Sequence, residues 1–587
     1  MSSDVKRMNM SKQFVFAAKL ADLKTSGCLS TQVDGHTLAL FLYGDAVYAV
    51  DNRCPHMGFP LDRGTVKDGI LTCHWHHARF DLASGGAFDL FADDVRAFPV
   101  EIRNGEAWVD IAPRADLRAH QRQRLRDGLE RDLSLVIAKA VLTLIEGGDS
   151  IEPFKVGLEF GARYRQAGWG QGLTILACMM NLLPQLDPED RPRALYHGLS
   201  AVADDTFGQP PRFAVQPLPA TLTDLATLKR WFRQFVEVRD AEGAERCIIS
   251  AVRAGAADRQ LADMLFAAAT DHRYLQTGHA LDFTNKALEA LDIVGWENRE
   301  MVELVLASLA SGYANADRME ESNAWRNPID LVEILERTFS DLTGLARSTS
   351  PQPSPDLSGL APILLGEDPQ LIADSLLTAL GDGCPPVELA GTVAYAAALR
   401  IARFHTSNEF GDWDTALHTF TFANAVHQGL RRTASPELIR GIFDAAMSVY
   451  LDRFLNVPAA RLPEPAGRDQ ADDPGSLLKE LPALLNQQQQ VDAVGELVAR
   501  CFYSGGQPEA MLATLGKLLL REDRDFHTIQ TVEAAFRQFT LLRGTTAGVH
   551  VLVAAARYLA AHSPTMRAQG QTYQIANRLS RGEKLFE

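Results

Sequence analysis

The chain has 587 residues, of which 46% are hydrophobic and 22% are charged, and its formal net charge is −16 at pH 7. This length suggests several domains, or one small and one large, and the acidic balance argues against a nucleic-acid or anionic-membrane partner. The sequence shows no signal peptide and no apolar run long enough to cross a membrane. Outside one motif the cysteines show no pairing pattern. These features predict a soluble, cytoplasmic protein.

Residues 12–112 predict a succession of short strands, because β-branched and aromatic residues cluster between turn residues. Turns are expected at Asp34-Gly35, Gly44-Asp45 and Asn104-Gly105. The strands are expected at Phe14-Val-Phe-Ala, Leu38-Ala-Leu-Phe-Leu, Ala46-Val-Tyr-Ala-Val, Ala97-Phe-Pro-Val-Glu-Ile and Ala107-Trp-Val-Asp-Ile.

Two Cys-plus-His pairs lie within this β-rich segment, Cys54-x-His56 and Cys73-x-x-His76. Such pairs can hold a [2Fe-2S] cluster asymmetrically, with two thiolates on one iron and two imidazoles on the other. Two neutral nitrogens in place of two anionic sulfurs raise the reduction potential above that of an all-cysteine cluster. The same four side chains also suit a zinc site, which is the alternative interpretation.

Supporting residues follow each pair: Gly58 after the first, and Phe80-Asp81 and Ser84-Gly85 after the second. With these residues the segment resembles the Rieske family over roughly residues 12 to 112. The resemblance implies a small antiparallel β domain, residues 1–112, that carries the cluster at its tip. His74 and His77 stand where the family usually has Pro and Gly, so we expect the second loop to be less tightly turned.

The resemblance also indicates the type of centre. Respiratory-type Rieske proteins carry one further cysteine in each loop and join the two in a disulfide, whereas this chain has Phe59 and Trp75 at those positions. The expectation is therefore a low-potential centre of the ferredoxin or oxygenase type. Such a centre passes single electrons to an oxygen-activating partner or site.

After Pro113 the apolar residues recur at spacings of three and four, which predicts a large all-α domain over residues 113–587. The Asp-x-x-His-x4-His motif that holds mononuclear iron in the usual Rieske oxygenase subunit is missing. Gly168-Trp-Gly-Gln-Gly is the nearest approach to a dinucleotide fingerprint, and it fails at the sixth position. Electrons are therefore expected from a separate NAD(P)H-dependent reductase or a ferredoxin.

An internal echo runs through the helical part, which suggests duplicated, repeat-like helical units packed about a common centre. Two segments share His-x3-Phe-x-Asn, beginning at His279 and His418; each has a second histidine upstream, and fainter copies occur further along the chain. A histidine at the same place in each unit could converge on iron, copper, nickel or zinc. The alternative is that each is a hydrogen-bonded core residue. The upstream histidines are His272 and His405, and the fainter copies begin at His527 and near His197.

These helices also resemble, over roughly residues 120 to 587, the questin-oxidase-like proteins, which act on polycyclic aromatic quinones and phenols. The resemblance implies a mononuclear non-haem iron held by several histidines and a carboxylated lysine. Lys517 is the candidate lysine, because it lies in a run that is apolar on every face. The alternative is that its stem packs while its amine reaches water. The candidate histidines are His197, His272, His279, His405 and His418.

The leading hypothesis is an oxidoreductase of the oxygenase type. The [2Fe-2S] cluster would feed electrons to a non-haem iron in the helical domain, which would activate O2 against a small hydrophobic, aromatic or polycyclic substrate. The rival is a Rieske electron carrier fused to a helical scaffold that only binds a partner protein. The sequence assigns no catalytic side chain.

Overall fold

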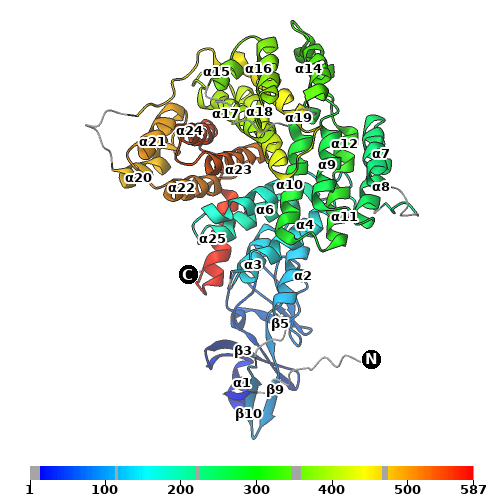
Figure 1. Ribbon diagram of the computed structural model, residues 1–587. Coiled ribbons are helices and arrows are strands. Elements are labelled where there is room, and N and C mark those ends of the chain that lie inside the picture. The colour runs from blue at the N-terminus through cyan, green and yellow to red at the C-terminus, as the bar shows by residue number, and fades with distance from the viewer. Residues whose placement is uncertain are drawn as a thin grey trace. The chain divides into compact units, whose positions relative to one another are not determined.

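The computed structural model describes residues 13–112, 117–146, 148–213, 215–219, 224–345, 359–465 and 473–585. Residues 343–345 are described by their backbone alone. The chain divides into two compact units (Figure 1). We call Met1–Pro153 with Gln571–Glu587 the N-terminal unit, and Phe154–Gly570 the helical unit. The predicted domain boundary at residue 113 lies outside the described residues and stays a prediction. The predicted fold class, an antiparallel β domain followed by a large helical region, is confirmed.

The N-terminal unit opens with antiparallel sheets (Figure 1). Their strand orders are β1-β10-β9, β2-β3-β4-β8 and β5-β6-β7. The strands are β1 Phe14–Lys19, β2 Cys28–Val33, β3 His36–Tyr43, β4 Ala46–Asp51, β5 Thr65–Lys67, β6 Ile70–Thr72, β7 Arg79–Asp81, β8 Ala97–Phe98, β9 Val100–Arg103 and β10 Glu106–Asp110.

Tight turns join neighbouring strands where the sequence predicts them. Asp34-Gly35 and Asn104-Gly105 both adopt positive φ at each residue, as two-residue hairpins require. The single strand expected over residues 97–102 is divided at Pro99 into β8, which pairs with β4, and β9, which pairs with β10. Because proline has no N–H to donate, it ends one ladder at the point where the chain crosses to the other.

Two hydrophobic cores lie in the β region, and one of them contains both motif cysteines. Cys54 and Cys73 pack there with Leu71 and Phe80, which are fully buried. The hairpin β5-β6-β7 thus holds the second motif loop against the loop that follows β4. The helices of this unit are α1 Leu20–Ser26, α2 Leu117–Glu130 and α3 Ser134–Leu144, together with most of α25 Ala568–Ser580 and a short 3-10 helix at Leu61–Arg63.

The helical unit consists of packed α-helices, as the spacing of its apolar residues predicts (Figure 1). None of the described helices combines the length and the apolar character needed to cross a bilayer. The helices are α4 Ile151–Arg163, α5 Gln171–Leu182, α6 Arg191–Thr206, α7 Leu225–Glu237, α8 Ala241–Arg253, α9 Asp258–Ala269, α10 His279–Val294, α11 Arg299–Ala307, α12 Ala310–Asn315, α13 Asn323–Arg326, α14 Leu331–Leu345, α15 Leu360–Leu364, α16 Pro369–Gly381, α17 Pro386–Ala402, α18 Phe410–Arg432, α19 Ile439–Leu451, α20 Pro474–Leu484, α21 Val491–Tyr503, α22 Pro508–Arg521, α23 Phe526–Leu541 and α24 Thr546–Ala561.

Helices α10, α18 and α23 come together at the centre of this unit, although they are far apart in the sequence. Helix α18 packs against both α10 and α23, and α5 lies against α10 and α23 from another side. Asp525 caps α23 by accepting a hydrogen bond from the Thr528 N–H, which fixes where that helix begins. Each of the three helices has a histidine in its first three turns, and these histidines form the second site described below.

Candidate metal centres

The first motif loop is a closed turn around Cys54. The Cys54 N–H donates to the Phe59 carbonyl at 2.8 Å, and the Gly58 N–H donates to the Cys54 carbonyl at 2.8 Å. Gly58 has φ +83°, a conformation that glycine adopts without a steric penalty.

The second loop repeats this arrangement around Cys73. The Cys73 N–H donates to the Ala78 carbonyl at 2.9 Å, and the His77 N–H donates to the Cys73 carbonyl at 3.1 Å. His77 has φ +60° and occupies the place that Gly58 has in the first loop. The expectation that this loop is less tightly turned is therefore wrong, because the histidine adopts the left-handed conformation that the turn requires.

The two loops bring all four predicted ligands together. Cys54 and Cys73 are 3% and 1% exposed, and their sulfurs share a hydrogen bond that lowers the pKa of Cys73 to about 6 and raises that of Cys54. The His56 and His76 rings lie edge to face with centroids 4.8 Å apart.

The His56 ring nitrogen Nδ1 is buried without a hydrogen-bond partner, which is costly unless something else binds it. Burial, then Lys139 and His76, lower the pKa of His56 to about 4, so the ring is neutral near pH 7 and can donate a lone pair. Two adjacent sulfurs beside two imidazoles fit the asymmetric ligand set of a Rieske cluster.

Comparison with known proteins supports the same interpretation. The model of the Rieske [2Fe-2S] domain matches residues 13–99. The ferredoxin component of the naphthalene 1,2-dioxygenase system of Pseudomonas putida is 28% identical over 104 residues, which is 18% of this chain and all of that relative. The ferredoxin component of the p-cumate 2,3-dioxygenase system of Pseudomonas putida is 32% identical over 79 residues, which is 13% of this chain and 67% of the relative.

Through these residues the chain belongs to the Rieske [2Fe-2S] family. Among solved structures, the ferredoxin of carbazole 1,9a-dioxygenase from Nocardioides aromaticivorans IC177 is 32% identical, with 17% of this chain and 99% of that chain covered and a TM-score of 0.16. A Rieske domain implies a [2Fe-2S] cluster. The match to this domain favours the cluster over the zinc alternative, which the four side chains alone would also suit.

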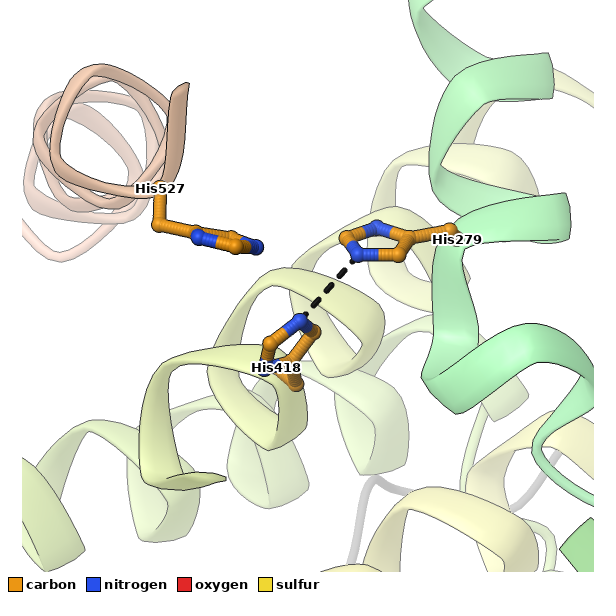
Figure 2. A group of neighbouring side chains, drawn as sticks. All are labelled: His279, His418 and His527. Atoms are coloured by element: carbon orange, nitrogen blue, oxygen red, sulfur yellow. Dashed lines mark hydrogen bonds between the residues drawn. The ribbon is translucent and has the colours of Figure 1, made fainter. Parts of the chain in front are cut away.

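A second group of possible ligands lies in the helical unit, where His279 of α10, His418 of α18 and His527 of α23 point toward one another (Figure 2). One ligand nitrogen of each lies within 4.8 Å of the others. The Nε2 atoms of His279 and His418 are 3.1 Å apart, and the Nε2 atom of His527 is buried without a hydrogen-bond partner. Three converging imidazoles with an unpartnered nitrogen among them are typical of a transition-metal site.

Carboxyl and carbonyl oxygens face the other ring nitrogens. His418 Nδ1 donates to the Asp414 carbonyl at 2.6 Å, and His527 Nδ1 lies 3.3 Å from the Asp414 carboxylate. His279 Nδ1 lies 3.7 Å from the Asp282 carboxylate. Only His418 Nδ1 makes a hydrogen bond to such an oxygen, which directs its Nε2 inward in the way that is usual for metal-bound histidine; His279 Nδ1 has no hydrogen-bond partner in the described part of the chain.

Burial favours the neutral form of His418 and His527. Burial, assisted by His279 and His527, lowers the pKa of His418 to about 4, and burial also lowers that of His527. Neutral rings can bind a metal near pH 7 without first releasing a proton.

A cavity of about 590 Å³ adjoins this cluster, and His279 forms part of its wall. This volume lies within the range of sites for small molecules. Aromatic rings and uncharged amides contribute to the lining, among them Trp169, Phe283, Tyr313 and Gln276.

The chain that enters α10 is backbone-strained next to both the cavity and His279. Tyr274, Gln276 and Thr277 have φ between +49° and +54°, and Gly278 has φ +92°. Left-handed conformations at three non-glycine residues are uncommon, and strain of this kind concentrates at functional sites. The Gln276 backbone and side chain both bond Asp317, which holds the strained segment in place.

The other predicted histidines do not join His279 and His418. His272 pairs with Glu320 at 2.6 Å and Glu237 at 2.9 Å, so both of its nitrogens face carboxylates. His405 is partly exposed and contacts Ser407 in its own turn. His197 is buried on α6, where burial and then Arg193 lower its pKa to about 3, and its ring lies edge-on to Tyr196.

Of the two interpretations of Lys517, the structure supports the one in which its amine reaches water, and the buried, carboxylated lysine is wrong. Its side chain is 57% exposed on α22 and its amine donates to Glu189 at 3.3 Å. The neighbouring leucines bury the opposite face of the helix, so the lysine stem packs while its amine reaches water.

His527 is the residue that the sequence analysis noticed but did not assign. Its segment lacks the Phe and Asn of the other two copies, so the echo there is faint. One signal could have identified His527. It lies two residues after Asp525, which caps α23, so it is in the first turn of that helix, just as His279 is in the first turn of α10.

Proposed function

We propose that the chain is a Rieske-type oxidoreductase of the oxygenase class, with a mononuclear non-haem iron on His279, His418 and His527. When bound, the [2Fe-2S] cluster supplies one-electron transfer, and the iron supplies oxygen activation. The observation that carries the proposal is the convergence of three partly buried imidazoles beside a cavity, in a chain that also has a Rieske domain.

The chain's own residues have separate tasks in this proposal. Cys54, Cys73, His56 and His76 hold the cluster, and the core around the cysteines excludes water from their sulfurs. At the second centre the Asp414 carbonyl accepts a hydrogen bond from His418 Nδ1 and the Asp414 carboxylate lies near His527 Nδ1, so that the Nε2 atoms of both rings would face the metal.

The cavity lining indicates the substrate class. Trp169, Phe283 and Tyr313 offer aromatic surface, and Gln276 offers an amide that can bind a carbonyl or hydroxyl group. We infer a small aromatic or polycyclic substrate, with O2 as co-substrate. An NAD(P)H-dependent reductase or a ferredoxin would supply the electrons. None of the seven cysteines, all of which lie in the described part of the chain, forms a disulfide, which is consistent with a reducing compartment such as the cytoplasm.

The decisive experiment counts metal and sulfide in the anaerobically purified protein. We expect about three irons to two acid-labile sulfides per chain, because the second centre adds one iron to the cluster. His418→Ala and His527→Ala should lower this to about two irons and leave the visible spectrum of the cluster intact. His405→Ala is the matched control, since that histidine lies outside the cluster of three.

One iron per sulfide, with no other transition metal present, would contradict the proposal and favour the electron carrier on a helical scaffold. Zinc in place of the third iron would contradict the oxygenase chemistry and leave the three-histidine site standing.

A further inference from the structure

Lys139 reaches the first cluster loop from outside the Rieske domain. It lies on α3, beyond the matched residues 13–99, and its Nζ donates to the Pro55 carbonyl at 2.7 Å and to the carbonyl of His56. A predicted cluster ligand and the residue before it are thus held by an ammonium group from the following helices.

This ammonium has no carboxylate partner of its own in the described part of the chain. The nearby acid, Asp93, accepts from His120 at 2.8 Å and lies 3.4 Å from Arg124. Arg124 offsets part of the Asp93 charge, which still acts on Lys139, and the Lys139 ammonium donates directly to the first cluster loop.

Other parts of the N-terminal unit cover the same loop. A Cβ at Gly58 would meet Arg53 Nε at 3.2 Å and Leu579 of α25 at 3.3 Å. Arg53 donates in turn to the Glu583 carbonyl at 3.0 Å. Side chains in place of water lower the local dielectric constant, so a charge there acts more strongly than it would in solution.

We propose that Lys139, through its positive charge beside the first cluster loop, raises the reduction potential of the cluster. Two ferric ions, two sulfides, two thiolates and two neutral imidazoles carry no net charge, and one electron from an external donor makes the centre singly negative. A fixed positive charge beside the loop therefore stabilises the reduced state more than the oxidised state. The inference concerns the cluster alone and does not depend on a second metal.

The test is a redox titration of the full-length holoprotein at pH 6.5, in which the paramagnetic signal of the reduced cluster is measured at each potential. Lys139→Gln keeps a donor and removes the charge, so we expect the reduction equilibrium constant to fall about tenfold, a negative shift of about 59 mV for one electron. Lys139→Arg should keep the potential near that of the wild type. Lys24→Gln, at an exposed lysine of α1, is the charge-matched control.

Thr143→Asp is a second variant that leaves Lys139 in place. A cavity of about 310 Å³ lies beside the first cluster loop and is lined by Cys54, Lys139 and Thr143. Thr143 lies one turn after Lys139 on α3, so the new carboxylate should also shift the potential negatively. The g values should stay the same in every variant, since no ligand changes. Unchanged potentials in Thr143→Asp and in any Lys139→Gln protein that retains its cluster would overturn the proposal. An equal shift in Lys139→Arg would overturn the assignment to charge.

Discussion

Single residues decide how tightly the cluster loops close. His77 takes the left-handed conformation that Gly58 takes in the other loop, and each N–H donates to the carbonyl of its cysteine. A left-handed conformation costs a residue with a side chain roughly 1–2 kcal/mol. The surrounding core and the hydrogen bonds of the loop must therefore offset this cost.

Substitutions at His77 should separate backbone strain from side-chain effects. We expect His77→Gly to be neutral or stabilising by up to about 1 kcal/mol. His77→Val should destabilise the loop by about 1–2 kcal/mol, because a β-branched residue avoids positive φ. The measurement is the loss of the cluster's visible absorbance in urea.

His74→Val is the control, since the residue lies in the same loop without a positive φ. If His77→Val lost its cluster at the same urea concentration as His77→Gly, the strain argument would fail.

At the scale of elements, a group of charged side chains joins α10 and α23. These side chains follow the histidine along each helix. Lys286 of α10 contacts Glu289 at 3.0 Å and Glu533 of α23 at 2.5 Å. Arg537 adds a second cation to each acid, and Asn181 of α5 donates to both. These contacts fix α10 against α23 and so hold His279 near His527.

Removing the positive charge of Lys286 should destabilise the helical unit. Lys286→Met leaves two buried carboxylates with less compensation, and we expect the helical unit to lose about 3–5 kcal/mol of unfolding free energy. The third iron should be lost with it. Lys229→Met is the matched control, because Lys229 also pairs with two acids but is 20% exposed. Urea unfolding followed by circular dichroism is the measurement, and equal losses in the two variants would contradict the prediction.

The sequence predicted elements best where the signal is local. Strands β1, β3 and β4 and the motif loops follow from turns and ligands only a few residues apart. Strand β2 and the short hairpin β5-β6-β7 were missed, because their few residues alternate weakly and their pairing depends on the cores. The split at Pro99 could have been predicted from the missing N–H.

At the scale of the whole molecule, the Rieske domain was predictable and the three-histidine cluster was predictable only in part. His279 and His418 are 139 residues apart, and only the pattern that their two segments share indicates that they converge. The echo selected this pair correctly, whereas His272 and His405 lie in loops where carboxylates or the local turn occupy them. Convergence depends on helix packing, which a single sequence does not encode locally.

Stability of the whole helical unit should also depend on pH through Asp452. Burial raises the pKa of Asp452 to about 7, and Thr419 and Arg400 offset this only in part. The folded chain thus keeps this proton up to about pH 7, whereas an unfolded aspartate releases it near pH 3.9. Its contribution to stability is full below the unfolded pKa and is lost as the pH rises through 7.

Asp452→Asn should remove this dependence. Between about pH 4 and pH 7 the folded state binds one more proton than the unfolded state, so the wild-type unfolding free energy should fall by up to about 1.4 kcal/mol per pH unit from this group. The lowered pKa values of His418 and His527 act in the opposite direction, so the difference between variant and wild type is the informative quantity. We expect this difference to grow from pH 5 to pH 7 in urea unfolding, with the exposed Asp382→Asn as control. Parallel curves for Asp452→Asn and wild type would show that the carboxyl is ionised in the folded protein.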